Sequence, residues 1–79
     1  MSPTIYRQGR YRFFFNSREE TRRHVHVSSA DGIAKFWLEP EITLAVSYNL
    51  NEKELGEIHA VVRERSDEFK SAWNRHFTR

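Results

Sequence analysis

The sequence predicts an α+β protein in which a small antiparallel sheet of four or five strands is followed by one or two helices that pack against it. Short segments of alternating apolar and polar residues, separated by turn residues, fill residues 1–49. From Leu50 onward the apolar residues recur at the spacing of an amphipathic helix. Strands followed by helices along the chain indicate the α+β class. We expect one domain over residues 1–79, with hairpins in 1–49 and helices in 50–79.

The first two strands are predicted over residues 4–7 and 11–15. Gly9 lies between them and can adopt the positive φ of a tight hairpin turn. In the second strand, alternation places three aromatic side chains on one face and Arg12 with Phe14 on the other. Aromatic side chains on both faces indicate a central strand that is covered on each side for part of its length.

The third strand is predicted over residues 24–28, where strict alternation puts His24 and His26 on one face and two valines on the other. The preceding residues, 17–23, include no apolar side chain and form a charged connection. We interpret this connection either as a solvated loop between two strands or as a basic flap that folds over a bound partner.

A second hairpin is predicted at Asp31-Gly32, because this dipeptide between two alternating segments is a strong turn signal. The fourth strand spans residues 33–38 and is stopped by Pro40, whose missing N–H cannot join a ladder. A short fifth strand is favoured over residues 41–48 by three alternating apolar residues, Ile42, Leu44 and Val46.

A helix is predicted to begin after Asn51, whose side chain can cap it together with Glu54. Ser66 can cap a second helix, in which two acidic residues fall in the first turn, where the helix dipole favours them. We expect Trp73 and Phe77 to hold this segment on the sheet. The pattern leaves open whether the chain bends near Ser66 or continues as one helix. The two apolar stripes comprise Leu55, Ile58, Val61 and Val62, and then Phe69, Ala72, Trp73 and Phe77.

Composition excludes several classes of protein. Cysteine is absent, so disulfides and thiol chemistry are excluded and a reducing compartment is favoured. No apolar run approaches the roughly 18 residues of a membrane span, and the first residues lack the apolar segment of a signal peptide. We therefore expect a soluble cytoplasmic protein without a cofactor. The edge strands of so small a sheet also suit pairing with a second copy or with a partner protein.

The net charge of +2 is unevenly distributed along the chain. Residues 1–23 hold six arginines against two glutamates, residues 24–52 carry a net charge of −3, and residues 53–79 carry +1. The basic excess therefore lies in the first strands, near the histidines, where it can contact a phosphate-bearing partner such as RNA. The candidate residues for binding an anion or a nucleic acid are Arg10, Arg12, Arg22, Arg23 and Lys35.

These segments resemble a bacterial family, the domain of unknown function numbered 4160. In this family a pair of prolines usually precedes the His-x-His strand, and here Arg22-Arg23 stand instead. The resemblance implies a small α+β protein encoded beside a second small protein in a toxin–antitoxin-like pair, with His24 and His26 as the characteristic histidines. It also implies a cognate protein partner. The residues that carry the resemblance are Pro3-Thr4-Ile5, Tyr11 to Phe15, His24 to Val27, Ala34 to Leu38, Ala72-Trp73-Asn74 and Phe77.

Two functions follow as hypotheses. In the one we favour, the protein is a toxin-like component that acts on or binds RNA or the translation machinery, with His24 and His26 as candidate acid and base and the arginines as phosphate ligands. In the other, it is an interaction module without turnover, in which Trp37 and Phe14 contact a partner protein and the histidines are surface residues. We assign no metal, because two histidines supply too few ligands for a site.

Overall fold

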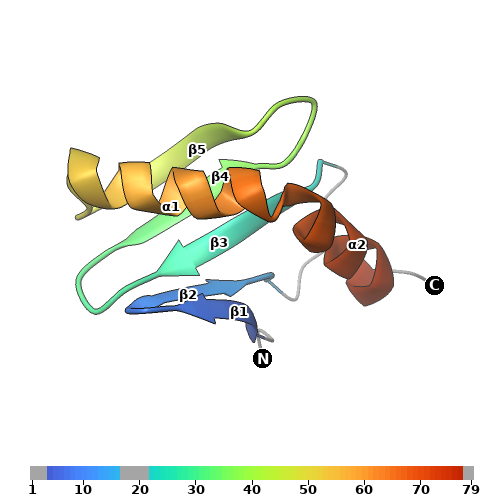
Figure 1. The fold of residues 1–79 in the computed structure, drawn as a ribbon, viewed down its shortest axis with the longest axis horizontal. Helices are drawn as coiled ribbons and strands as arrows, with labels where there is room; N and C mark the ends of the chain where they lie inside the picture. Colours follow the sequence, from blue (N-terminus) through green and yellow to red (C-terminus); the bar gives the residue numbers. More distant parts are fainter. Residues whose placement is uncertain (1–3, 17–21, 78–79) are drawn as a thin grey trace.

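The structure, a computed structural model, describes residues 4–16 and 22–77. Most of the charged connection predicted over residues 17–23 therefore lies outside the described residues. Five strands form one antiparallel sheet in the order β1-β2-β3-β4-β5, and two helices follow, so the predicted α+β fold is confirmed (Figure 1). The elements are β1 (Thr4–Gln8), β2 (Tyr11–Phe14), β3 (His24–Ser28), β4 (Ile33–Trp37), β5 (Thr43–Tyr48), α1 (Glu52–Glu64) and α2 (Ser66–Phe77).

Both helices lie on one face of the sheet, which we call the inner face; α1 crosses the strands and α2 continues at an angle near one end of them (Figure 1). Phe13 on β2 packs against Phe69 on α2 with ring centroids 5.6 Å apart. Trp73 contacts Phe15 in an edge-on arrangement at 5.4 Å, so its predicted role in holding α2 on the sheet is confirmed. The remaining buried apolar residues are Tyr11, Val25, Val27, Ala34, Phe36, Leu38, Ile58, Val61 and Val62.

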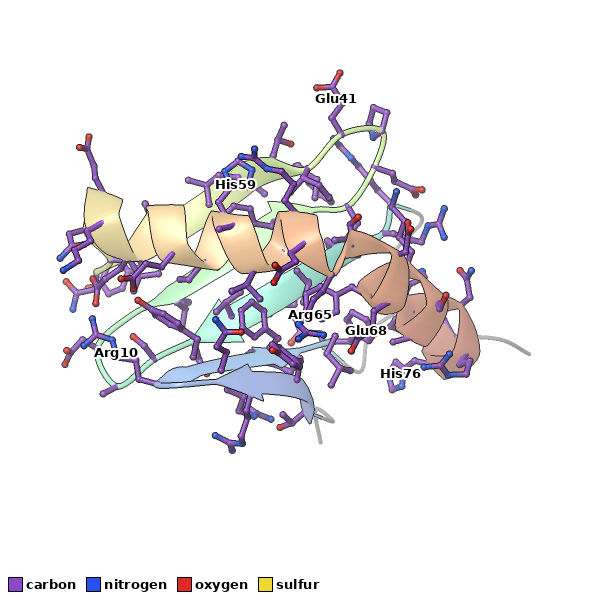
Figure 2. All side chains as sticks on the ribbon, in the orientation of Figure 1. Arg10, Glu41, His59, Arg65, Glu68 and His76 are labelled. Carbon is purple, nitrogen blue, oxygen red and sulfur yellow. The ribbon has the colours of Figure 1, made fainter. Side chains whose placement is uncertain are left out.

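The chain after the sheet forms two helices that meet at Arg65. Asn51 and Glu54 make the predicted capping box, in which each side chain accepts a hydrogen bond from the other's backbone N–H. Arg65 has φ −111° and ψ 23°, which ends α1. Ser66 is the first residue of α2 rather than its predicted cap. The Arg65 guanidinium forms an ion pair of 2.9 Å with the Glu68 carboxylate (Figure 2). It also lies 4.2 Å from the ring centre of Tyr6, and this contact connects the bend between the helices to β1.

A β-bulge divides β5. Lys35 pairs with Val46 and Phe36 pairs with Leu44, so Ala45 is an extra residue without a partner in the register. The predicted fifth strand is confirmed, but its alternation does not continue along its whole length. Because the bulge shifts the side chains by one position, Val46 lies on the opposite face of the sheet from Leu44.

The two hairpin turns use glycine for different reasons. Gly9 has the predicted positive φ, 57°. Gly32 instead lies against the neighbouring backbone, where a Cβ would clash with the carbonyl oxygens of Tyr48 and Asn49. Asn49 has φ 63° and its side-chain amide donates to the Asp31 carbonyl at 2.9 Å. These contacts fix the end of β5 against the β3–β4 turn.

Candidate functional site

The face of the sheet opposite the helices, which we call the outer face, is built from rows of paired residues. Directly paired residues of antiparallel strands lie on the same face of a sheet. The first row runs through Arg7, Arg12, Ser28, Ile33 and Tyr48. The second row runs through Thr4, Phe14, His26, Lys35 and Val46. The third row joins His24, Trp37 and Thr43.

The strands carry only positive charges, whereas the helices carry charges of both signs. The five strands contain no Asp or Glu, and their cations, Arg7, Arg12 and Lys35, all lie on the outer face. The helices, on the other side of the sheet, contain six acidic residues, Glu52, Glu54, Glu57, Glu64, Asp67 and Glu68, and four basic ones, Lys53, Arg63, Lys70 and Arg75. The outer face therefore presents a positive potential to an anionic partner.

Cations and rings alternate on this face. The rings of Phe14 and His26 are stacked, with centroids 5.5 Å apart and planes 22° apart. The Arg12 guanidinium lies 4.5 Å from the centre of the Phe14 ring. The Arg22 guanidinium and the Lys35 ammonium lie 4.1 and 4.5 Å from the centre of the Trp37 ring, within the range of cation–π contacts. Such a surface combines aromatic rings with positive charges that can contact phosphate.

The two predicted histidines occupy different environments. His24 is only 1% exposed. Its ring packs between the rings of Trp37 and of Trp73 on α2, with centroid distances of 5.7 and 4.9 Å. Its Nδ1 lies 2.9 Å from the Arg22 carbonyl oxygen, which can only accept a hydrogen bond, so Nδ1 carries the proton. His26 is half-buried on the outer face and meets His24 edge-on at 5.0 Å. His24 thus joins the outer face to α2, and His26 is the histidine placed among the cations and rings.

Arg22 and Arg23 anchor the chain before β3 to the chain after β4. The backbone N–H and Nε of Arg23 donate to the Glu39 carboxylate at 3.1 and 2.9 Å, and Nε of Arg22 donates to the Glu39 carbonyl at 2.8 Å. The hydrogen bonds from the backbone and guanidinium of Arg23 hold the pKa of Glu39 below its ordinary value. The hydrogen bonds of these two arginines therefore fix the start of β3 to the chain that follows β4.

The five predicted basic residues do not form one cluster. Arg12, Arg22 and Lys35 lie against the aromatic rings described above. The Arg23 guanidinium is paired with Glu39. Arg10 lies in the turn of the first hairpin and forms an ion pair of 2.6 Å with Glu54 at the start of α1 (Figure 2). The outer-face cluster is thus Arg12, Arg22 and Lys35, with the predicted contact residues Phe14 and Trp37.

Several outer-face residues were not predicted as site residues, among them Arg7, Ile33, Val46 and Tyr48. The hairpin turn at Gly9 and Arg10 would have been a usable signal for Arg7, because a two-residue turn sets Arg7 opposite Arg12. No local signal exists for Val46, since its face depends on the bulge at Ala45.

Among the described residues, no group of three or more His, Cys, Asp and Glu side chains is arranged to hold a metal ion. In the same part of the chain, neither helix has the length and apolar character needed to cross a membrane.

The fold and the outer face define a small α+β protein in which helices cover one face of the sheet and the other face carries cations among aromatic rings. A family model described as Domain of unknown function (DUF4160) matches residues 10–74. Because this match extends over most of the chain, the protein belongs to that family. Neither the curated proteins nor the solved structures gave a match.

Proposed function

We propose that the protein binds single-stranded RNA through the outer face of its sheet. The observation that carries this proposal is that Arg12 and Lys35 lie beside aromatic rings, with Arg7 paired to Arg12, on a face whose strand residues include no carboxylate. Lys and Arg supply affinity for phosphate, and rings on a sheet supply stacking for unpaired bases. Bases in an RNA duplex are already stacked and paired, so the rings favour a single strand.

The geometry favours binding over cleavage. A general acid and a general base must both reach the reacting phosphodiester, directly or through one water. His26 lies on the outer face, but His24 is enclosed by Trp37 and Trp73 and donates from Nδ1 to a backbone carbonyl. We therefore propose that the toxin-like role implied by the family resemblance works by binding RNA or the translation machinery without cleaving it. In this proposal, a cognate partner protein covers the outer face when the toxin-like activity is switched off.

Removing charge from each side of the molecule tests the RNA proposal. Binding of a labelled single-stranded RNA is measured by fluorescence anisotropy for the double variant Arg12→Ala/Lys35→Ala. The matched control is Arg63→Ala/Arg75→Ala, which removes the same charge from exposed helix positions. We expect at least about a tenfold loss for the first variant and a shallower salt dependence, because each lost phosphate contact reduces the salt slope by about one. Equal losses for both variants would contradict the proposal.

Expression in a bacterial host separates binding from cleavage. Growth and total RNA are compared for the wild type and for His26→Ala after induction. Arrest with intact RNA is the result that we expect. New RNA fragments that disappear in the variant would instead establish His26 as a catalytic residue and overturn the binding mechanism.

A second candidate function is strand pairing with a partner protein at β5. This strand forms one edge of the sheet, and none of its six residues is charged. Uncharged edge strands are templates for addition of another strand. If this function holds, Val46→Lys disrupts a complex with the cognate partner, measured by sedimentation, whereas Arg12→Ala/Lys35→Ala leaves the complex intact.

A further inference from the structure

We infer that a small pocket on the outer face, between β4 and β5, holds one unstacked base of the single-stranded RNA. This inference rests on the proposed function and names the part of the RNA that the site recognises. The pocket has a volume of about 140 Å³. Its lining residues are His26, Ile33, Ala34, Lys35, Val46, Ser47 and Tyr48.

The size of the pocket selects the ligand group. Pockets for whole drug-sized molecules have volumes of about 300–1,000 Å³. A volume of about 140 Å³ is smaller and suits one planar ring. The sugar and the phosphate of a bound nucleotide therefore remain outside the pocket, where they continue into the rest of the strand.

The lining suits a base with an attached phosphate. Two cross-strand pairs of β4 and β5 line the pocket, Ile33 with Tyr48 and Lys35 with Val46. Ile33, Val46 and Tyr48 are 56%, 59% and 70% exposed, so their apolar surface is open to a ligand. The Tyr48 ring can stack on a base, and the Lys35 ammonium is the cation among the lining residues. Those residues include no carboxylate that would repel a phosphate.

The walls of the pocket are fixed by the backbone before any ligand binds. The bulge at Ala45 turns Val46 to the outer face. Close packing of Gly32 against the Tyr48 carbonyl, followed by the positive φ of Asn49, fixes the end of the strand that carries Tyr48. A preformed wall lowers the ordering cost of binding.

The second row of the outer face extends the path of the strand. From Lys35 the row continues to His26 and Phe14, and the Arg12 guanidinium lies over the Phe14 ring. A base in the pocket thus places the next phosphates near Lys35 and Arg12 and the next base near the Phe14–His26 pair. This continuity of rings and cations favours RNA over an apolar peptide as the occupant.

The test compares two oligonucleotides of equal length and charge. One is oligouridine, and the other is the same backbone with abasic sites in place of all bases. We expect the wild type to bind oligouridine about 5- to 100-fold more tightly, the range of stacking effects per base. Tyr48→Ala should remove most of this preference, whereas Tyr48→Phe should keep it. Leu44→Ala is the control, because Leu44 is also exposed on β5 but lies on the other face.

The outcomes separate the two proposals. If the wild type binds both oligonucleotides equally and Arg12→Ala/Lys35→Ala weakens both, the RNA proposal stands and the base pocket is wrong. If the wild type binds neither, both proposals fall. If Tyr48→Ala keeps the full preference for oligouridine, the pocket does not hold a base and this inference is wrong. Circular dichroism of each variant confirms that the fold is retained.

Discussion

Phe14 and His26 are paired directly across β2 and β3, and their rings stack at 5.5 Å with 22° between their planes. The pair lies in the middle of the outer face. The Arg12 guanidinium lies over the Phe14 ring, and Lys35 of β4 pairs directly with His26. Stacking on each other fixes the positions of the two rings on this face before a base binds.

His26→Ala is expected to weaken binding of single-stranded RNA by about fivefold or more, because it removes one of the two rings that can contact a base. His26→Phe should retain most of the affinity, since it keeps a ring at the same position. His76→Ala on α2 is the control, because His76 is exposed on the helical side (Figure 2). Anisotropy measures all three, and an equal loss for His26→Ala and His76→Ala would exclude the stacked pair from binding.

His24→Ala is expected to lower the free energy of unfolding by about 2–4 kcal/mol, since it removes a buried ring and leaves the Arg22 carbonyl without that donor. His26→Ala should cost about 1 kcal/mol or less, because its ring is only half-buried. Urea denaturation measures both values. Equal stability of the two variants would show that His24 does not join the outer face to α2.

Glu39 gives the protein an acid-sensitive contact. Its pKa is lowered by hydrogen bonds from the Arg23 backbone and guanidinium. A carboxyl whose pKa is lower in the folded than in the unfolded protein stabilises the fold above the unfolded pKa, and this contribution is lost as pH falls through the folded pKa. The wild type should therefore lose stability below about pH 4.3 more steeply than Glu39→Gln. Urea denaturation across this pH range tests the difference, and parallel curves would refute it.

Gly32→Ala is expected to lower the free energy of unfolding by about 1–3 kcal/mol, because the new Cβ meets the carbonyl oxygens of Tyr48 and Asn49. Gly56→Ala provides a matched control in α1, where a Cβ meets nothing within 4 Å. This control should raise stability by about 0.5–1 kcal/mol through helix propensity. Thermal unfolding compares the two, and a neutral Gly32→Ala would mean that the end of β5 is not fixed by this close packing.

The elements that could be predicted from the sequence depend on local pattern. Asn51 and Glu54 are three residues apart and form their capping box without help from the rest of the chain. Gly9 has the positive φ that its place between two strands indicates. The histidine strand alternates as expected, with Val25 and Val27 buried on the inner face.

The parts of the candidate site that were not predicted depend on distant partners. Arg10 forms an ion pair with Glu54, which lies 44 residues further along the chain, and no sequence pattern predicts this contact. His24 is enclosed by Trp73, which only the packing of α2 brings near. Tyr48 belongs to the outer face because of its pairing with Ile33, which the sequence does not specify.

The central claim is that the outer face, rather than the helical side, contacts RNA. The most direct test is backbone amide chemical-shift mapping by NMR as single-stranded oligouridine is added. We predict that the shifted signals concentrate on Phe14, His26, Lys35 and Tyr48, and that the exposed residues of α1 and α2 keep their positions. Shifts confined to the helices, or no shifts at oligouridine concentrations that saturate anisotropy, would contradict it.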